Sequence, residues 1–378
     1  MAKQELDVTY YYSYLFMATV LLLPILLIAM FRPPRKHDGE NLPPGPWRLP
    51  VIGSMHHLVG ALPHHAMRDL ARRYNAPLML LRLGELDVVV ASSASAAKEI
   101  MKTHDTTFAT RPRTATLRAI TRDDLGISLA PHGEHWRRLK KLGVTELLSA
   151  RQVRSLRGCR QANAAALVSS IIVSSLSETS VTTLQWAMAE LMRSPAALRR
   201  FQTEVRGALM GESCICEDAL QELHYLNLVI KETLRPHLVV PLILPRECQE
   251  PCRILGYDVP KGAMVLVNVW AIGRDSASWG TDAEEFRPER FEEAGDASVD
   301  FRETNFELVP FGAGRRMCPG VTFGLAVVEL MLASLLFHFD WGLPGGGAGG
   351  LDMVEELGIT ARRKGDLLLH ATVSCACS

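Results

Sequence analysis

The longest apolar stretch of the chain lies near its amino end. From Val8 to Phe31 there is no Asp, Glu, Lys or Arg, and a helix of these twenty-four residues would be about 36 Å long, enough to span a bilayer. Arg32, Arg35 and Lys36 follow, with no small-residue cleavage site before them. The pattern predicts an uncleaved single membrane anchor, with the C-terminal body on the cytosolic side.

The rest of the chain predicts one body over 37–378, after an anchor and basic flank over 1–36. A proline-rich hinge at 42–50 excludes helix and favours an extended spacer. Apolar runs on both sides of Gly84 predict a β-hairpin, and 264–270 is strand-like. Apolar residues at helical spacing predict helices over 132–149, 180–192, 195–210 and 224–235. The expected fold class is therefore mainly α with a small β-sheet.

A second long apolar run covers 321–339, and it could be a membrane span or a core helix. Glu329 lies inside it, and ionisable residues are rare in membrane spans. We therefore interpret this run as a helix buried in the core of the body.

Composition narrows the possible partners and metals. Forty-one Lys plus Arg balance forty-one Asp plus Glu in 378 residues, so the basic excess of a nucleic-acid binder is missing. Of the eight cysteines, two Cys-x-Cys pairs begin at Cys214 and Cys375, but no paired histidine spacing completes a zinc site. Cysteines of a cytosolic body are expected to stay reduced. No nucleic acid, zinc or disulfide framework is predicted.

The strongest chemical signal is FGAGRRMCPG at 311–320, a cysteine in a glycine-rich loop before a long helix. Alone, it could be a turn with a buried thiol. The loop nevertheless resembles the haem-binding loop of the cytochrome P450 family. The matching positions are Phe311, Gly314, Arg316, Cys318 and Gly320. The resemblance implies haem b, iron protoporphyrin IX, as cofactor, with Cys318 as the metal ligand through its thiolate.

Two further motifs match the same family in order. Glu232 and Arg235 of KETLR lie one helical turn apart, and Arg290 belongs to FRPERF. Such a pair exposed on a helix would contribute only a few tenths of a kcal/mol. The resemblance implies instead a buried network of the three residues, which supports the cysteine loop.

The resemblance also assigns residues to the two carboxylate side chains of the haem. Trp136 and Lys140 in HWRRLKK match a Trp-x-x-x-Arg pair, with lysine in place of arginine and its bidentate geometry. Arg246 and Arg316 match the remaining contacts. For Trp136, packing in the core is an equal alternative.

On the opposite side, the family delivers protons to bound dioxygen through an acid and an alcohol in a central helix. SETSVTTLQWAMAELM resembles that helix, which makes Glu178 and Thr179 the catalytic candidates. LGIT at 357–360 resembles a turn that points into the substrate pocket.

One part of the family pattern is missing. The resemblance covers nearly the whole chain and is closest to the plant microsomal branch, yet only 26 residues, Gln152–Ser177, precede Glu178. Family members carry several helices here that roof the substrate pocket. The glycine-containing element expected before the acid and alcohol is replaced by VSSLS. The sequence thus predicts a truncated P450 fold with a complete haem loop.

Three alternative functions are compatible with the sequence. The first is a monooxygenase, single-pass in the endoplasmic reticulum membrane, which inserts one oxygen atom of O₂ into a small lipophilic substrate. It would serve plant specialised metabolism, such as terpenoid hydroxylation, with electrons from NADPH through a membrane reductase. The second is a catalytically impaired haem-binding relative or truncated gene product. The third is an anchored zinc or redox protein that uses the Cys-x-Cys pairs.

Overall fold

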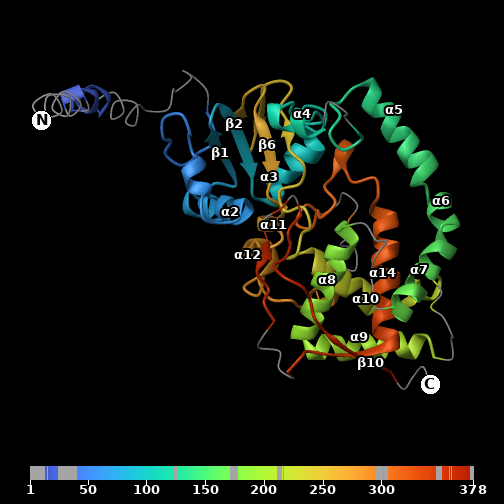
Figure 1. The fold of residues 1–378 in the computed structure, drawn as a ribbon. Helices are drawn as coiled ribbons and strands as arrows, with labels where there is room; N and C mark the ends of the chain where they lie inside the picture. Colours follow the sequence, from blue (N-terminus) through green and yellow to red (C-terminus); the bar gives the residue numbers. More distant parts are fainter. Residues whose placement is uncertain are drawn as a thin grey trace, which may run out of the picture.

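A computed structural model describes most of the chain. The described residues are 13–14, 16–23, 41–121, 126–170, 178–210, 215, 217–293, 301, 305–345, 351–356, 358 and 360–374. A small β-sheet with its flanking helices forms one part of the body, and a group of longer helices forms the other (Figure 1). The fold is mainly helical with small sheets, as the sequence predicts.

The main sheet has four strands in the order β1-β2-β6-β3. Strands β1 (Leu78–Leu83) and β2 (Leu86–Ala91) form the predicted hairpin, and β2 pairs in parallel with β6 (Met264–Val267). Strand β3 (Arg246–Glu247) pairs antiparallel with β6. The strand-like run ends earlier than expected, because the Asn268 side chain accepts a hydrogen bond from Ala271 N and caps a short helix.

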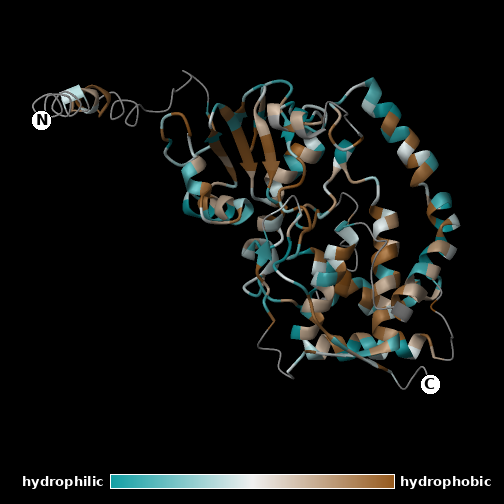
Figure 2. Ribbon diagram, in the orientation of Figure 1, coloured by the Kyte–Doolittle hydropathy of each residue, from teal (hydrophilic) through white to brown (hydrophobic). Residues whose placement is uncertain are grey.

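The predicted helices are confirmed. They are α5 (Glu134–Leu142), α8 (Glu178–Arg193), α9 (Pro195–Ala208), α10 (His224–Leu234) and α14 (Val321–His338). Helix α14 packs against α8, α9, α10 and α7 (Arg157–Ser170), and it is apolar over most of its length (Figure 2). Within the described part of the chain, α14 is the one helix long and apolar enough to cross a membrane, yet 56% of it is buried in the body. This burial supports the interpretation as a core helix.

The other elements are short. They are η1 (Met55–Leu58), α2 (Pro63–Arg73), α3 (Ala94–Lys98), η2 (Glu99–Thr103), α4 (Ala115–Thr121), η3 (Gly143–Leu147), α6 (Ala150–Ser155), η4 (Ala219–Glu222), β4 (Cys252–Ile254), β5 (Tyr257–Val259), α11 (Val269–Ile272), α12 (Ser276–Trp279), α13 (Arg290–Glu293), η5 (Gly314–Arg316), β7 (Phe339–Gly342), β8 (Glu355–Glu356), β9 (Arg362–Arg363) and β10 (His370–Val373).

The proline-rich segment 42–50 contains no helix, and it is attached to the sheet. Leu80 N of β1 donates a hydrogen bond of 2.9 Å to Pro44 O. A Cβ atom at position 45 would lie 2.0 Å from Leu80 O, so only glycine allows this approach. Of the predicted anchor, residues 13–14 and 16–23 are described; they are helical and exposed.

The short segment before α8 forms two helices along the edge of the body. Helices α6 and α7 follow α5, and α7 packs against α14 (Figure 1). The VSSLS stretch that replaces the expected glycine element lies outside the described residues, as do both Cys-x-Cys pairs.

Candidate functional site

A cavity of about 480 Å³ lies between α5, the start of α8, the segment after α10, the cysteine loop and α14. Its volume is typical of sites for small molecules and cofactors. Seven of the residues singled out from the sequence line it: Trp136, Lys140, Thr179, Phe311, Arg316, Cys318 and Gly320. The structure thus brings together residues that lie up to 184 positions apart in the chain.

The cysteine loop presents its sulfur to this cavity. Cys318 N donates a hydrogen bond of 3.0 Å to Phe311 O, which closes the loop just before α14 begins. The Cys318 side chain is exposed toward the cavity. Burial of the surrounding loop raises the pKa of the thiol, and a hydrogen bond from Gly320 N opposes this effect. The sulfur is therefore accessible and already has one donor that favours the thiolate.

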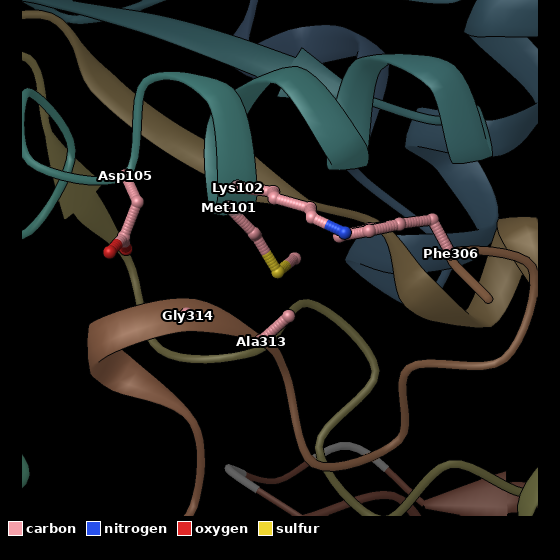
Figure 3. Close-up of a pocket in the computed structure, with 6 residues that line it drawn as sticks. All are labelled: Met101, Lys102, Asp105, Phe306, Ala313 and Gly314. Carbon is pink, nitrogen blue, oxygen red and sulfur yellow. The ribbon is translucent and has the colours of Figure 1, made fainter. Parts of the chain in front are cut away.

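Gly314 holds the loop against the segment that ends η2. Its φ is +70°, and a Cβ atom there would lie 2.2 Å from Met101 O and 2.5 Å from Asp105 Oδ1. Figure 3 shows Met101 and Asp105 on one side of a small cavity, and Ala313 and Gly314 on the other. Asp105 accepts hydrogen bonds from Arg315 N at 3.1 Å and from Arg315 Nη1 at 2.7 Å.

The sequence gives no sign that Asp105 contacts the cysteine loop. It stands alone in its stretch, 210 residues before Arg315, so no local spacing connects it with the loop. The carboxylate is 9% exposed and also lies 3.6 Å from Arg246 Nη1. Asp105 therefore joins the cysteine loop to β3 and to the end of η2.

We expect Gly314→Ala to destabilise the protein. The left-handed backbone alone costs about 1–3 kcal/mol for alanine, and the contact with Met101 O adds to it. Thermal or urea unfolding of the full chain measures the loss. The matched control is Gly158→Ala in α7, where an added Cβ meets no atom within 4 Å. Equal stability of the two variants would show that the loop does not depend on this close approach.

Three buried guanidinium groups lie close together; Arg111 and Arg316 line the cavity, and Arg246 does not. Arg246 and Arg316 were selected from the sequence, and Arg111, which was not, lines the cavity beside Arg316. Burial, together with the charges of Arg246 and Arg316, lowers the pKa of Arg111 to about 9. Burial likewise lowers the pKa of Arg246 and of Arg316 to about 10. Among the described residues, Asp105 is the carboxylate beside these three guanidinium groups, so the cluster carries an excess of positive charge.

One of these donors makes no hydrogen bond, although Asp105 Oδ1 lies 3.6 Å from it. Among the described residues, Nη1 of Arg246 is buried without a hydrogen bond, although Nη2 donates to Ala313 O at 2.9 Å. Arg316 Nε and Nη2 donate to Ala109 O and Ala130 O, both at 2.6 Å. A buried donor that makes no hydrogen bond is costly, so an anionic group that reached Arg246 Nη1 would stabilise this cluster.

Trp136 is packed in the core and also lines the cavity. It is 4% exposed, and its Nε1 donates to Ile127 O at 2.9 Å, as a core residue would. It also lines the cavity, with the Arg316 guanidinium 4.2 Å from its ring centre. Lys140 Nζ donates to Arg315 O at 2.5 Å, so α5 is bound to the cysteine loop from the side.

These features fit a haem b. A thiolate sulfur is a soft ligand for iron, and the buried guanidinium groups of Arg111 and Arg316 in the cavity wall, with Arg246 close to both, suit two carboxylate side chains. Cys318, Arg246 and Arg316 are the residues that the sequence predicts for these roles. Arg111 was missed because RPR, taken alone, carries no specific signal.

Thr179 and Glu178 occupy different positions relative to the cavity. Thr179 lines it together with Cys318, whereas Glu178 does not. The Glu178 Oε1 atom accepts a hydrogen bond of 2.8 Å from Thr360 Oγ1, and both Glu178 and Thr179 are exposed. Thr360 comes from the turn expected to point into the pocket, where Leu357 and Ile359 lie outside the described residues. The turn therefore contacts the start of α8.

Glu232 and Arg235 of KETLR form a buried ion network with Arg290 of FRPERF. Arg235 Nε and Nη2 donate to Glu232 Oε2 and Oε1, both at 2.8 Å, and Arg290 Nε donates to Oε1 at 3.0 Å. Glu232 and Arg235 are fully buried, and Arg290 is 6% exposed. The guanidinium groups also bind backbone carbonyls of 273, 279, 282, 283 and 285. The network thus fixes the turn-rich segment that leads to the cysteine loop.

The comparisons with known proteins decide the family. The model of the family "Cytochrome P450" matches residues 43–176 and 162–368. The chain belongs to the cytochrome P450 family. It is 36% identical to premnaspirodiene oxygenase of Hyoscyamus muticus, with 89% of this chain and 93% of that protein covered. It is also 36% identical to 5-epiaristolochene 1,3-dihydroxylase of Nicotiana tabacum, with the same coverage. Desmethyl-deoxy-podophyllotoxin synthase of Sinopodophyllum hexandrum is 36% identical, with coverages of 93% and 96%.

Membership makes the protein a cytochrome P450 monooxygenase of plant type, with haem as the family's cofactor and electrons from a redox partner. The comparisons also locate the deletion. The alignment with premnaspirodiene oxygenase has 473 positions against 378 residues in the chain, so at least 95 positions of that relative have no counterpart here. The two ranges that match the family model overlap over residues 162–176, which lie inside the segment that the sequence identifies as shortened.

Proposed function

We propose that this cytochrome P450 inserts one oxygen atom of O₂ into a small lipophilic terpenoid. The observation that carries the proposal is the accessible Cys318 sulfur in a cavity with buried guanidinium groups at its edge. When bound, a thiolate-ligated haem supplies the activation of O₂, because the sulfur donates electron density that favours cleavage of the O–O bond.

On the cysteine side, the chain's residues hold and orient the cofactor. Cys318 is the proposed iron ligand, and Gly320 N stabilises its thiolate. Arg246, whose Nη1 makes no hydrogen bond, and Arg316 are the proposed partners of the haem carboxylates. Trp136 and Lys140 close the side of the cavity along α5. Phe311, Gly314 and Gly320 shape the loop, and Glu232, Arg235 and Arg290 support it.

On the oxygen side, Thr179 is the proposed hydroxyl that holds a proton inside the cavity. Glu178 is the proposed acid that supplies it, and Thr360 orients the Glu178 carboxylate through the 2.8 Å hydrogen bond. Because Glu178 is exposed, it can exchange protons with solvent.

The substrate class is supported by the relatives and by the lining of the cavity. Their names include premnaspirodiene oxygenase, 5-epiaristolochene 1,3-dihydroxylase and germacrene A hydroxylase. The apolar residues of the lining suit a hydrocarbon skeleton; they are Leu234, Val239, Val240, Ile243, Leu244, Phe323, Leu325 and Val328.

The proposed setting is the cytosolic face of the endoplasmic reticulum membrane. Residues 1–36 form the proposed single-pass anchor and its basic flank, and 37–378 form the monooxygenase domain with the hinge at 42–50. The proposed electron donor is a membrane reductase that oxidises NADPH. The apolar run from Val8 to Phe31, followed by basic residues, supports this arrangement.

A second function, a haem-binding relative that does not turn over, is favoured by the shortened segment before α8. The test is the reduced carbon monoxide spectrum of the full chain in membranes, followed by incubation with NADPH, a plant reductase and each of three substrates. Premnaspirodiene, 5-epiaristolochene and germacrene A form the panel. A thiolate-type Soret band with a hydroxylated product supports the monooxygenase. The band without product supports the second function, and no band in well-expressed protein contradicts both.

A further inference from the structure

A second group of metal-ligating side chains lies outside the cavity. His64 and His65 stand in the first turn of α2, and Glu355 begins β8, about 290 residues later. None of the three lines the cavity of Cys318. Among the described residues, this is the group whose ligand atoms all lie within 4.8 Å of one another.

The geometry aims two imidazole nitrogens at one oxygen. His64 Nε2 lies 2.8 Å from Glu355 Oε2, and His65 Nε2 lies 3.0 Å from the same atom. In a tetrahedral zinc site with bonds of about 2.0–2.2 Å, neighbouring ligand atoms are roughly 3.3 Å apart. Each histidine nitrogen therefore needs to move only a few tenths of an ångström from Glu355 Oε2, and the two nitrogens already lie within 4.8 Å of each other.

A supporting shell holds these ligands in place. Trp270 Nε1 donates to Glu355 Oε1 at 3.0 Å and leaves Oε2 for the shared position. The Trp270 ring stacks on His65 with centroids 4.1 Å apart. Asn268 Nδ2 donates to His64 O at 2.8 Å, which fixes the first turn of α2 beside the start of α11. Hydrogen bonds of this kind orient metal ligands in known sites.

The local charges allow a divalent ion. The guanidinium groups of Arg68 and Arg274 lie over the Trp270 ring, and each forms an ion pair with a carboxylate. Arg274 pairs with Glu284 at 2.9 Å, and Arg68 pairs with Asp69 at 3.0 Å.

We propose that His64, His65 and Glu355 form a zinc site, with solvent as the fourth ligand. Two imidazoles and one carboxylate are a ligand set that Zn²⁺ favours, and His65, 34% exposed, gives the ion a route from solvent. In the ion-bound form, each imidazole carries its hydrogen on Nδ1 and presents Nε2 to the metal. The ion would join α2 to the C-terminal segment that contains Thr360.

The test uses the full chain with haem bound, in detergent micelles and without a polyhistidine tag. Equilibrium dialysis against Zn²⁺ alone, followed by atomic absorption, should find one ion per chain. His65→Gln should abolish this binding, whereas the matched control His224→Gln, whose side chain is 61% exposed beside Glu292, should keep it. Both variants should retain the carbon monoxide band of the parent protein, which shows that they are folded.

Co²⁺ as a probe distinguishes this site from cysteine binding. Absorption bands of tetrahedral Co²⁺ without a thiolate-to-cobalt charge-transfer band support the proposal, and a charge-transfer band contradicts it. Absence of zinc from the parent protein, or equal binding by His65→Gln, overturns it. Should His65→Gln lose its haem band, the Co²⁺ spectrum of the parent protein decides alone.

Discussion

Cys318→Ala should reduce the haem content of the purified protein to background and remove the thiolate-type carbon monoxide band. The sulfur is exposed toward a cavity of about 480 Å³, and no other cysteine lines that cavity among the described residues. The loop itself should survive, because its closing hydrogen bond from position 318 to Phe311 O uses the backbone. The variant thus removes the proposed ligand and leaves its frame.

The measurement is the haem-to-protein ratio after expression in membranes, with circular dichroism to compare helix content. Cys159→Ala is the matched control, because Cys159 is an exposed thiol on α7 outside the cavity. Cys159→Ala should keep the parent ratio. A Cys318→Ala protein that kept the haem content of the parent and the parent's position of the carbon monoxide Soret band would contradict the ligand assignment.

Glu232→Gln should have the largest effect on stability. It removes the carboxylate that accepts three hydrogen bonds from Arg235 and Arg290, and it leaves two buried guanidinium groups without that charge. Breaking a buried network in this way costs about 3–5 kcal/mol. Arg287 N, which donates to Glu232 Oε1 at 2.8 Å, retains an acceptor in the amide oxygen, so the loss reports on charge.

Urea unfolding of the parent and of Glu232→Gln gives the difference in their free energies of unfolding. The haem-to-protein ratio shows whether the cysteine loop depends on the ion network. The control is Glu134→Gln, which breaks an exposed pair with Arg138 on α5. Such a pair contributes less than about 1 kcal/mol. If Glu232→Gln were as stable as Glu134→Gln, the network would not be a support of the fold.

The sequence predicted the elements well where the pattern was long or the turn was specific. Helix α14 followed from its apolar run, and the β1-β2 hairpin followed from two apolar runs around Gly84. The end of β6 was not predicted, because a single side chain, Asn268, decides it by capping the next helix. Local chemistry of this kind competes with strand propensity and leaves no periodic signal.

The site could be predicted only where residues form a dense motif. The loop around Cys318 is such a motif, and its resemblance to a family supplied the cofactor. Asp105 and Arg111 are equally close to the cavity or its loop, yet each acts through partners more than a hundred residues away. The same is true of the contact between Thr360 and Glu178. Only the folded chain shows such pairs.

The parallel pairing of β2 with β6 has a consequence for biosynthesis. Val88 pairs with Met264, so 176 residues must leave the ribosome after β2 before its second edge is covered. At about 5–20 residues per second, the edge stays open for roughly 10–35 seconds. Val88, Val89 and Val90 are fully buried once folding is complete, and an open apolar edge recruits other strands. The nascent chain therefore exposes an edge that can pair with other strands during this interval, and a chain released between the two strands would keep that edge open.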